Sequence, residues 1–322
     1  HGRIWIGTDN GLAMLEGGEI KIFTTQEGLS NINITCLLES STGAIWIGTD
    51  GGVDVLESGS FTHYGVEEGL SNNFVNSLLE TSTGEIWIGT YGGVDVYESG
   101  SFKHYGVKEG LSDNRVWSLM ESTSGAIWIG TSGGGINVFE SDSFKHYGVE
   151  EGLSDNRVWS LLESSSGAIW IGTYGGGVDV FESGNIIHYG VEEGLSSNLV
   201  VGLLESATGA IWIAMADGGI DVYESNSFLH YGEEEGLSYN GVLSLLESSS
   251  GAVWVGTYGG GVNVFQSRNF HHYGMEEGLG NDFVVTLLES SSGAIWIGDN
   301  GGGLDVFQSE SFLHYTTEEG LG

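Results

Sequence analysis

The 322-residue sequence contains no proline and a single cysteine, Cys36. One thiol excludes an intramolecular disulfide and a zinc site built from cysteines. With 57 glycines and no proline, we expect tight turns to rely on glycine, asparagine and aspartate. No hydrophobic run is long enough for a membrane span. No signal peptide is visible either, because the chain opens on His1-Gly-Arg-Ile-Trp5, which has the pattern of an internal repeat.

Basic residues are also scarce. Eight Lys and Arg face 44 Asp and Glu, which gives a formal net charge of −36. Such a surface repels phosphate backbones and anionic membranes, so a nucleic-acid partner is not expected. It attracts cations or basic partners, and it also keeps a repetitive β protein soluble.

A tryptophan motif, Ile-Trp-Ile-Gly-Thr or a near variant, recurs along the whole chain. Its tryptophans are Trp5, Trp46, Trp87, Trp128, Trp170, Trp212, Trp254 and Trp296. The spacing is 41 residues three times and then 42 residues four times. A period of this length indicates a propeller or solenoid array rather than separate domains.

One repeat contains four short apolar runs bounded by Gly, Ser or Asn. In the fifth repeat they are residues 157–163, 168–173, 178–182 and 186–189. Runs of this length between turn residues predict antiparallel strands, and no segment shows a sustained helical period. We therefore expect an all-β β-propeller with eight repeats of four-stranded antiparallel blades, as one domain over residues 1–322. The first repeat lacks its inner strand, so seven complete blades plus an N-terminal partial blade is the alternative.

The string from Glu109 to Gly134, and its near copy from Glu151 to Gly176, resembles the two-component regulator propeller repeat. The resemblance covers essentially the whole chain. It implies a sensor-type β-propeller of the kind found outside the cytoplasm in hybrid histidine kinases, which respond to carbohydrates. No kinase or DNA-binding part is present in this sequence, so signalling itself is not implied.

Positions that differ between the copies are the candidates for recognition. At the start of the first strand, two adjacent repeats carry Arg115 with Trp117 and Arg157 with Trp159. Alternation along a strand puts each pair on one side, where an indole beside a guanidinium suits a sugar ring or a carboxylate. The loop before the third strand adds Tyr91, Tyr174 and Tyr258. These seven residues are the predicted ligand-binding site. The alternative is that the tryptophans are packing residues and the arginines pair with nearby glutamates.

Other polar residues recur in nearly every repeat, which favours structural roles. Histidines such as His63 and His188 occupy one place in the outer strand, too far apart between blades to share a metal. Aspartates such as Asp54 sit within the third strand and are expected to hydrogen-bond a neighbouring loop. Paired glutamates such as Glu192 and Glu193 could attract calcium, but no calcium-binding loop motif is present. No catalytic motif is found, so we expect no catalytic residue, no metal and no cofactor.

The sequence therefore predicts a non-enzymatic binding propeller, extracellular or periplasmic, with a glycan or protein ligand. The alternative is a structural or self-assembling extracellular propeller. In that case the incomplete first repeat leaves an open edge at which a partner chain, including a second copy, adds a strand.

Overall fold

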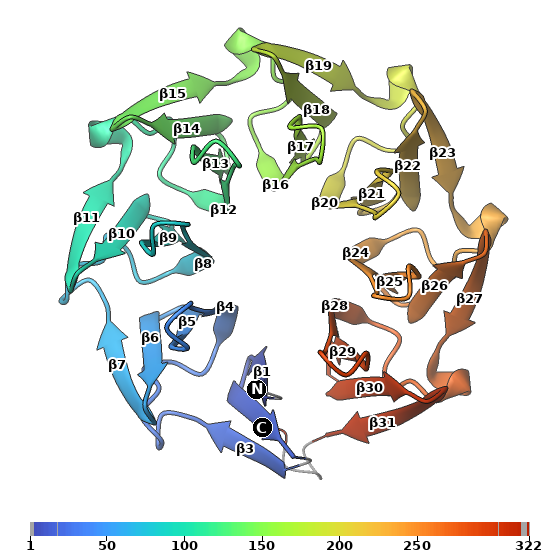
Figure 1. Ribbon diagram of the computed structural model, residues 1–322, viewed down its shortest axis with the longest axis horizontal. Helices are drawn as coiled ribbons and strands as arrows, with labels where there is room; N and C mark the ends of the chain where they lie inside the picture. The colour runs from blue at the N-terminus through green and yellow to red at the C-terminus, as the bar shows by residue number, and fades with distance from the viewer. Residues whose placement is uncertain (1–2, 18, 302, 317–320, 322) are drawn as a thin grey trace. The chain divides into compact units, whose positions relative to one another are not determined.

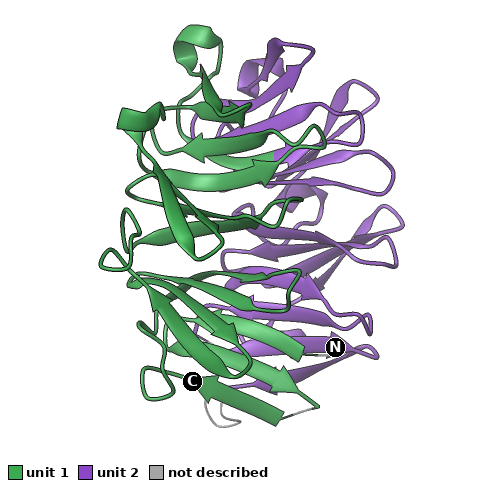
Figure 2. Ribbon diagram, turned by 60° about the vertical axis from the view of Figure 1, so that its left-hand side comes forward, with its two compact units in different colours: residues 1, 3–161, 322 green, residues 2, 162–321 purple. Residues whose placement is uncertain are grey.

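The computed structural model describes residues 3–17, 19–301, 303–316 and 321. The chain divides into two compact units, which Figure 2 colours separately. Unit 1 runs from Arg3 to Leu161 and unit 2 from Leu162 to Leu321. The sequence-based prediction of a single domain over residues 1–322 stays a prediction.

Unit 1 holds a three-stranded sheet followed by three four-stranded sheets, each called a blade below. Blade 1 consists of β1 (Arg3–Thr8), β2 (Gly11–Glu16) and β3 (Glu19–Phe23). Blade 2 consists of β4 (Ile34–Glu39), β5 (Ile45–Thr49), β6 (Gly52–Glu57) and β7 (Ser60–Tyr64). Blade 3 consists of β8 (Val75–Glu80), β9 (Ile86–Thr90), β10 (Val94–Glu98) and β11 (Ser101–Tyr105). Blade 4 consists of β12 (Val116–Glu121), β13 (Ile127–Thr131), β14 (Ile136–Glu140) and β15 (Ser143–Tyr147).

The division between the units falls within β16 (Val158–Glu163), the first strand of blade 5. Blade 5 continues with β17 (Ile169–Thr173), β18 (Gly177–Glu182) and β19 (Asn185–Tyr189). Blade 6 consists of β20 (Val200–Glu205), β21 (Ile211–Met215), β22 (Ile220–Glu224) and β23 (Ser227–Tyr231). Blade 7 consists of β24 (Val242–Glu247), β25 (Val253–Thr257), β26 (Val262–Gln266) and β27 (Asn269–Tyr273). Blade 8 consists of β28 (Val284–Glu289), β29 (Ile295–Asp299), β30 (Leu304–Gln308) and β31 (Ser311–Tyr315).

Within each blade the strands follow chain order and pair with their sequence neighbours (Figure 1), so the first and fourth strands form the two edges. The first strands of successive blades lie against one another, β4 against β8 and β8 against β12 in unit 1, and β20 against β24 and β24 against β28 in unit 2. The prediction of an all-β β-propeller with eight antiparallel blades is confirmed, and among the residues that the structure describes blade 1 has three strands.

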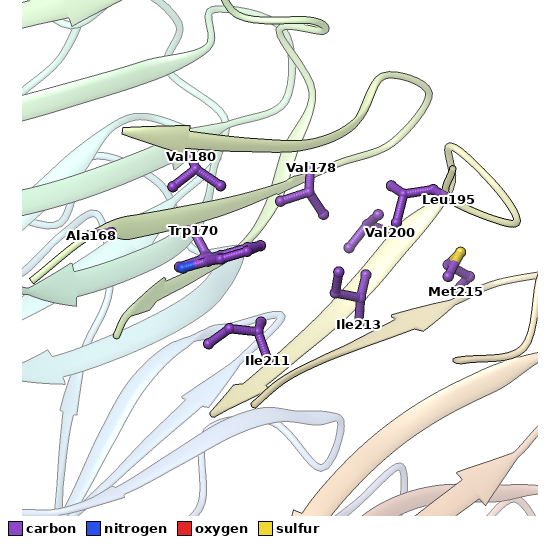
Figure 3. Packing of buried hydrophobic residues seen from close by; sticks show 9 residues of the cluster. All are labelled: Ala168, Trp170, Val178, Val180, Leu195, Val200, Ile211, Ile213 and Met215. Carbon is purple, nitrogen blue, oxygen red and sulfur yellow. The ribbon is translucent and has the colours of Figure 1, made fainter. Parts of the chain in front are cut away.

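The core of each unit lies between the faces of adjacent blades. Figure 3 shows one such cluster, in which Trp170 of β17 packs with Val178, Val180, Ile211 and Ile213. The second strands of blades 2 to 7 are buried at every position. Because both faces of these strands are covered, the tryptophan and its β-branched neighbours are packing residues, as one copy per blade suggests.

The turns between third and fourth strands differ from expectation. In blades 2 to 8 the first turn residue is a serine with positive φ, for example Ser183 at 53° followed by Gly184 at 84°. A two-residue hairpin loop of this hand needs positive φ at both central positions. The second position is Gly, Asp or Asn in five of these seven turns, as expected, and Arg268 or Glu310 in the other two. The serine at every first position is what the sequence-based expectation did not include.

Short 3-10 turns connect several blades. They are η1 (Val107–Glu109), η2 (Val149–Glu151), η3 (Val191–Glu193), η4 (Glu233–Glu235) and η5 (Met275–Glu277). The last glutamate of each turn folds back on its start, as Glu193 does when its Oε2 accepts the Gly190 N–H at 2.9 Å. In each of these turns the last glutamate is therefore a turn cap.

Candidate functional site

The start of the first strand and the loop after the second strand meet at the same end of a blade. In blade 4 the Ser132 N–H donates to the Arg115 carbonyl at 2.9 Å, and in blade 3 the Tyr91 N–H donates to the Phe74 carbonyl at 3.2 Å. In blade 7 Tyr258 makes the same bond to Gly241 at 2.7 Å. With the equivalent bonds of blades 6 and 8, these bonds bring the two variable segments of five blades to one end of the blade.

A β-bulge fixes the direction of the variable residue in the first strand. In blade 4 Val116 pairs with Thr131 and Ser118 pairs with Gly130, so Trp117 between them has no partner across the ladder. The same shift occurs at the equivalent residues, which are Thr35, Asn76, Val201, Leu243 and Val285. A bulged residue leaves the regular alternation and is often re-aimed next to a functional site. Sequence reasoning missed the bulge, because the pairing that defines it is not local.

The bulged residues of unit 1 reach the first strand of the next blade. The Thr35 hydroxyl donates to the Val75 carbonyl at 2.6 Å, and the Asn76 amide donates to the Val116 carbonyl at 2.9 Å. At the next step Trp117 stacks on Trp159, with ring centroids 5.1 Å apart and planes 13° from parallel. Trp117 is 36% exposed, and Trp159 is half-buried. The Trp pair thus replaces a polar contact with a partly exposed aromatic surface.

Both arginines of the candidate site pair with the aspartate two residues before them. The Arg157 guanidinium binds Asp155 through Nε at 3.0 Å and Nη2 at 2.6 Å, whereas Arg115 Nε lies 3.9 Å from Asp113 Oδ1. Partial burial acts to raise the pKa of Asp155, but the hydrogen bonds and charge of Arg157 outweigh it and leave that pKa below its ordinary value. Each arginine thus pairs with an aspartate, and the looser Arg115 is the more available of the two guanidinium groups.

The tyrosines are divided between the units. Tyr91, in unit 1, is 38% exposed and stacks on Phe74 with centroids 4.3 Å apart. Tyr174 and Tyr258 belong to unit 2, where Tyr174 bridges to Leu199 and Tyr258 contacts the Phe283 ring at 4.2 Å. Arg115, Trp117, Arg157, Trp159 and Tyr91 thus share a unit, while Tyr174 and Tyr258 lie in the other.

The recurring aspartates bind neighbouring loops, as expected from the sequence. The buried Asp54 accepts the Ser30 N–H and hydroxyl on Oδ2 at 2.9 and 2.8 Å, and His63 Nδ1 lies 3.0 Å from Oδ1. The serine hydroxyl donates to the aspartate rather than to the histidine, so this trio does not activate a nucleophile. Its role is to fasten the loop to the third strand.

Within the part of the chain that the structure describes, no cluster of three or more His, Cys, Asp or Glu is arranged to hold a metal ion. None of the helices in that part has the length and hydrophobicity that a membrane crossing requires.

Five segments match the family model described as two component regulator propeller. They are residues 28–51, 69–92, 110–133, 152–175 and 236–259. Each covers the connection into a blade and its first two strands, which is the part that carries the bulge and the tryptophan motif. These are two component regulator propeller repeats.

Solved structures similar to this chain are propellers of several kinds. One, described as the extracellular domain of a hybrid two component system, BT3049 from B. thetaiotaomicron, is 22% identical with a TM-score of 0.43, over 100% of this chain and 51% of that one. The chain thus spans about half the length of that domain. Streptogramin B lyase is 16% identical with a TM-score of 0.63, over 84% of this chain and 91% of the lyase.

A computationally designed protein, Ika8, is 15% identical with a TM-score of 0.70, over 95% and 93% of the two chains. The lyase and the designed protein share the fold with this chain, and identities this low extend the likeness no further. No curated protein was found to match the chain.

Proposed function

We propose that this chain is a non-enzymatic recognition domain that binds a glycan on the surface around the Trp pair of unit 1. The observation that carries the proposal is the stack of Trp117, which is bulged and 36% exposed, on the half-buried Trp159. Indole faces stack well on the apolar faces of sugar rings, and Trp117 is 36% exposed. Arg115 and Tyr91 add polar and aromatic contacts at the same end of the blades.

The distribution of polar residues supports binding rather than catalysis. The aspartates and histidines that could act as acid or base recur in nearly every blade and are bound to each other and to loop serines. Residues that break the repeat are mainly aromatic, apolar or arginine, and these favour recognition. The sensor-type repeats favour an extracellular or periplasmic location, where glycans are available as ligands.

The test is a glycan array probed with the parent chain and with a double variant, Trp117→Val and Trp159→Val. Valine is the residue that blade 6 places at the same bulge, as Val201, so the change suits the fold. We expect the double variant to lose binding by at least about tenfold, because one stacked aromatic contributes roughly 1–1.5 kcal/mol.

A matched control is Val285→Ala, which changes the equivalent, 47% exposed bulge residue of unit 2. It is expected to bind as the parent does. Equal glycan binding by the double variant and the parent would show that the glycan does not bind at the Trp pair. Binding to a protein ligand without any glycan would replace the glycan with another partner.

One observation favours a second function, assembly by strand addition. Residues Ile4, Trp5 and Ile6 of β1 are only partly buried, whereas the equivalent residues of β5 are fully buried. Within the described residues β1 pairs only with β2, so its other edge presents backbone donors and acceptors. The occupant that fits is an extended segment with the pattern of the other first strands, such as Val75–Glu80, supplied by a second copy.

The measurement is light scattering over a range of concentrations, with a peptide of residues 72–81 as competitor. If copies assemble by adding a strand to the open edge of β1, oligomers should form and the peptide should dissociate them. The same peptide N-methylated at the backbone positions of the ladder should leave them intact. A monomer at every concentration contradicts the assembly function and leaves the glycan site unaffected.

A further inference from the structure

A pocket of about 640 Å³ opens on the outer side of unit 2, between the fourth strand of blade 5 and the last hairpin of blade 6. Its wall includes Glu182, Ile187, Tyr189, Glu193, Tyr223 and Phe228. None of these residues belongs to the proposed glycan site.

Three aromatic rings form one side of the pocket. Tyr189 lies 5.5 Å from Tyr223 and 5.3 Å from Phe228, measured between ring centroids, and Tyr223 lies 5.0 Å from Phe228. The two tyrosine hydroxyls are 3.3 Å apart. Behind them Trp170 stacks on Tyr189 at 6.4 Å with planes 12° from parallel. The wall is therefore rich in π-electron density and rigidly held.

Other blades show what such a ring attracts. Lys103 places its ammonium 4.8 Å from the centre of the Tyr105 ring, and Lys145 does the same over Tyr147 at 4.7 Å. In blade 1 Lys21 lies 4.6 Å over Phe23. Each lysine lies two residues before the aromatic residue of the same strand. In all three blades it pairs with the equivalent position of the preceding strand. The chain itself thus uses an ammonium over this aromatic position three times.

Blade 5, like blades 2, 6, 7 and 8, has no lysine at this position, and it is the one beside which the pocket opens. Ile187 holds the lysine position opposite Val180, in the register that Lys103 has opposite Val96. Its side chain is 43% exposed and carries no charge. The Tyr189 ring therefore occupies the same position in its blade as Tyr105 and Tyr147. Unlike those two rings, it has no lysine from the same strand above it.

Carboxylates surround the same opening. Glu182 ends β18 and pairs with Asn185 at the start of β19. The Glu193 carboxylate is held at the rim by the Gly190 N–H at 2.9 Å and lies 3.7 Å from His188 Nε2. With a net charge of −36, the long-range field also draws cations toward the surface.

We propose that this pocket binds the ammonium group of a lysine side chain supplied by a basic partner protein. The ammonium takes the place over Tyr189 that Lys103 takes over Tyr105, with Glu182 and Glu193 as counter-charges. The Ile187 side chain packs against the apolar stem of the incoming lysine.

The test titrates the chain with an acetylated, amidated tetralysine peptide by isothermal calorimetry. The same peptide with acetylated side chains serves as the neutral probe. Ile187→Lys gives the pocket its own ammonium, as in blades 3 and 4, and is expected to weaken tetralysine binding by about tenfold, the equivalent of one desolvated cation–π contact. Leu313→Lys adds the same charge at the same register of β31, where Leu313 is 53% exposed, and is expected to stay within about twofold of the parent.

The proposal is supported if tetralysine binding is saturable, is weakened by Ile187→Lys and is unchanged by Leu313→Lys. Equal weakening by both variants assigns the binding to net charge and overturns the proposal. Equal binding of the acetylated peptide, or none by tetralysine, overturns it as well. Circular dichroism of each variant shows that the blades are intact. The glycan experiment uses another unit and another ligand, so the two proposals fail independently.

Discussion

A buried carboxylate in the third strand shows how a single residue ties a blade to the loop that precedes it. Asp95 is fully buried. Its Oδ2 accepts the Ser71 N–H and hydroxyl at 3.0 and 2.7 Å, and its Oδ1 lies 3.0 Å from His104 Nδ1. Burial nevertheless raises the pKa of Asp95 above its ordinary value, because these partners do not fully replace water.

In blade 4 an uncharged residue, Asn137, holds the preceding loop in the same way. Asn137 accepts the Ser112 N–H at 3.0 Å and donates to the Ser112 hydroxyl at 2.8 Å. His146 then turns its Nδ1 to the Ile136 carbonyl at 3.2 Å. The amide therefore keeps the loop contact and removes the desolvated charge.

We expect Asp95→Asn to raise the free energy of unfolding at pH 7 by roughly 1 kcal/mol, because the amide can keep the serine contacts, as Asn137 does in blade 4, and carries no desolvated charge. A carboxyl whose folded pKa is raised contributes stability below its unfolded pKa, and that contribution is lost as the pH rises through the folded value. The advantage of the variant should therefore shrink as the pH falls toward 3. Denaturant unfolding at a series of pH values measures it.

The converse change, Asn137→Asp, serves as the control and should lower stability at pH 7. A variant Asp95→Asn that is less stable than the parent at neutral pH would show that the histidine contact outweighs the cost of burial.

At the scale of strands, the first and second strands of a blade approach so closely that the facing residues must be small. Gly130 of β13 stands against Ser118 of β12, and a Cβ at Gly130 would clash with the Ser118 hydroxyl and lie 2.8 Å from Val158 Cγ1. The same pairing of glycine with a small side chain recurs, with Cys36 opposite Gly48 in blade 2. Burial raises the pKa of the Cys36 thiol to about 12, so this cysteine is a packing residue rather than a nucleophile.

Blade 6 exchanges the two roles. Gly202 stands where other blades have serine, cysteine or threonine, and Ala214 stands where they have glycine, with the Ala214 Cβ 3.5 Å from the Cβ that Gly202 would carry. The methyl group that Ala214 adds on the second strand occupies the space left by the missing side chain of Gly202 on the first strand. Comparison of the copies in the sequence alone could have revealed this exchange.

Gly130→Ala should destabilise the chain by roughly 1–3 kcal/mol through overpacking. Adding Ser118→Gly should recover about 1 kcal/mol or more of that loss, because the two positions are in direct contact. Thermal unfolding of the parent, both single variants and the double variant gives the coupling free energy. Additive effects would mean that the clash is relieved by movement of the backbone instead.

At the scale of the whole chain, blades are joined by glutamates at the ends of first strands. Glu121 of blade 4 accepts the Ser82 N–H and hydroxyl of blade 3 at 2.6 and 2.7 Å. Glu289 of blade 8 holds Ser249 of blade 7 in the same way. Some of the acidic residues thus hold neighbouring blades together, and all 44 count toward the net charge of −36.

Much of this frame could be predicted from the sequence, because a blade is a local unit whose strands and turns are consecutive. The period of Trp46 and its copies predicts the number of blades, and the missing run before Trp5 predicts the three-stranded sheet. The bulge at Trp117, the stack on Trp159 and the pairing of Arg157 with Asp155 could not be predicted. They depend on side-chain directions and on the spacing between blades, which a strand pattern does not define.

The central claim is that the repeats build the fold, while the residues that differ between them carry recognition. The most direct measurement follows thermal unfolding and glycan-array binding together in the double variant Trp117→Val and Trp159→Val. The account predicts a midpoint within a few degrees of the parent and loss of glycan binding. Retained binding, or unfolding of the blades without the tryptophans, would contradict it.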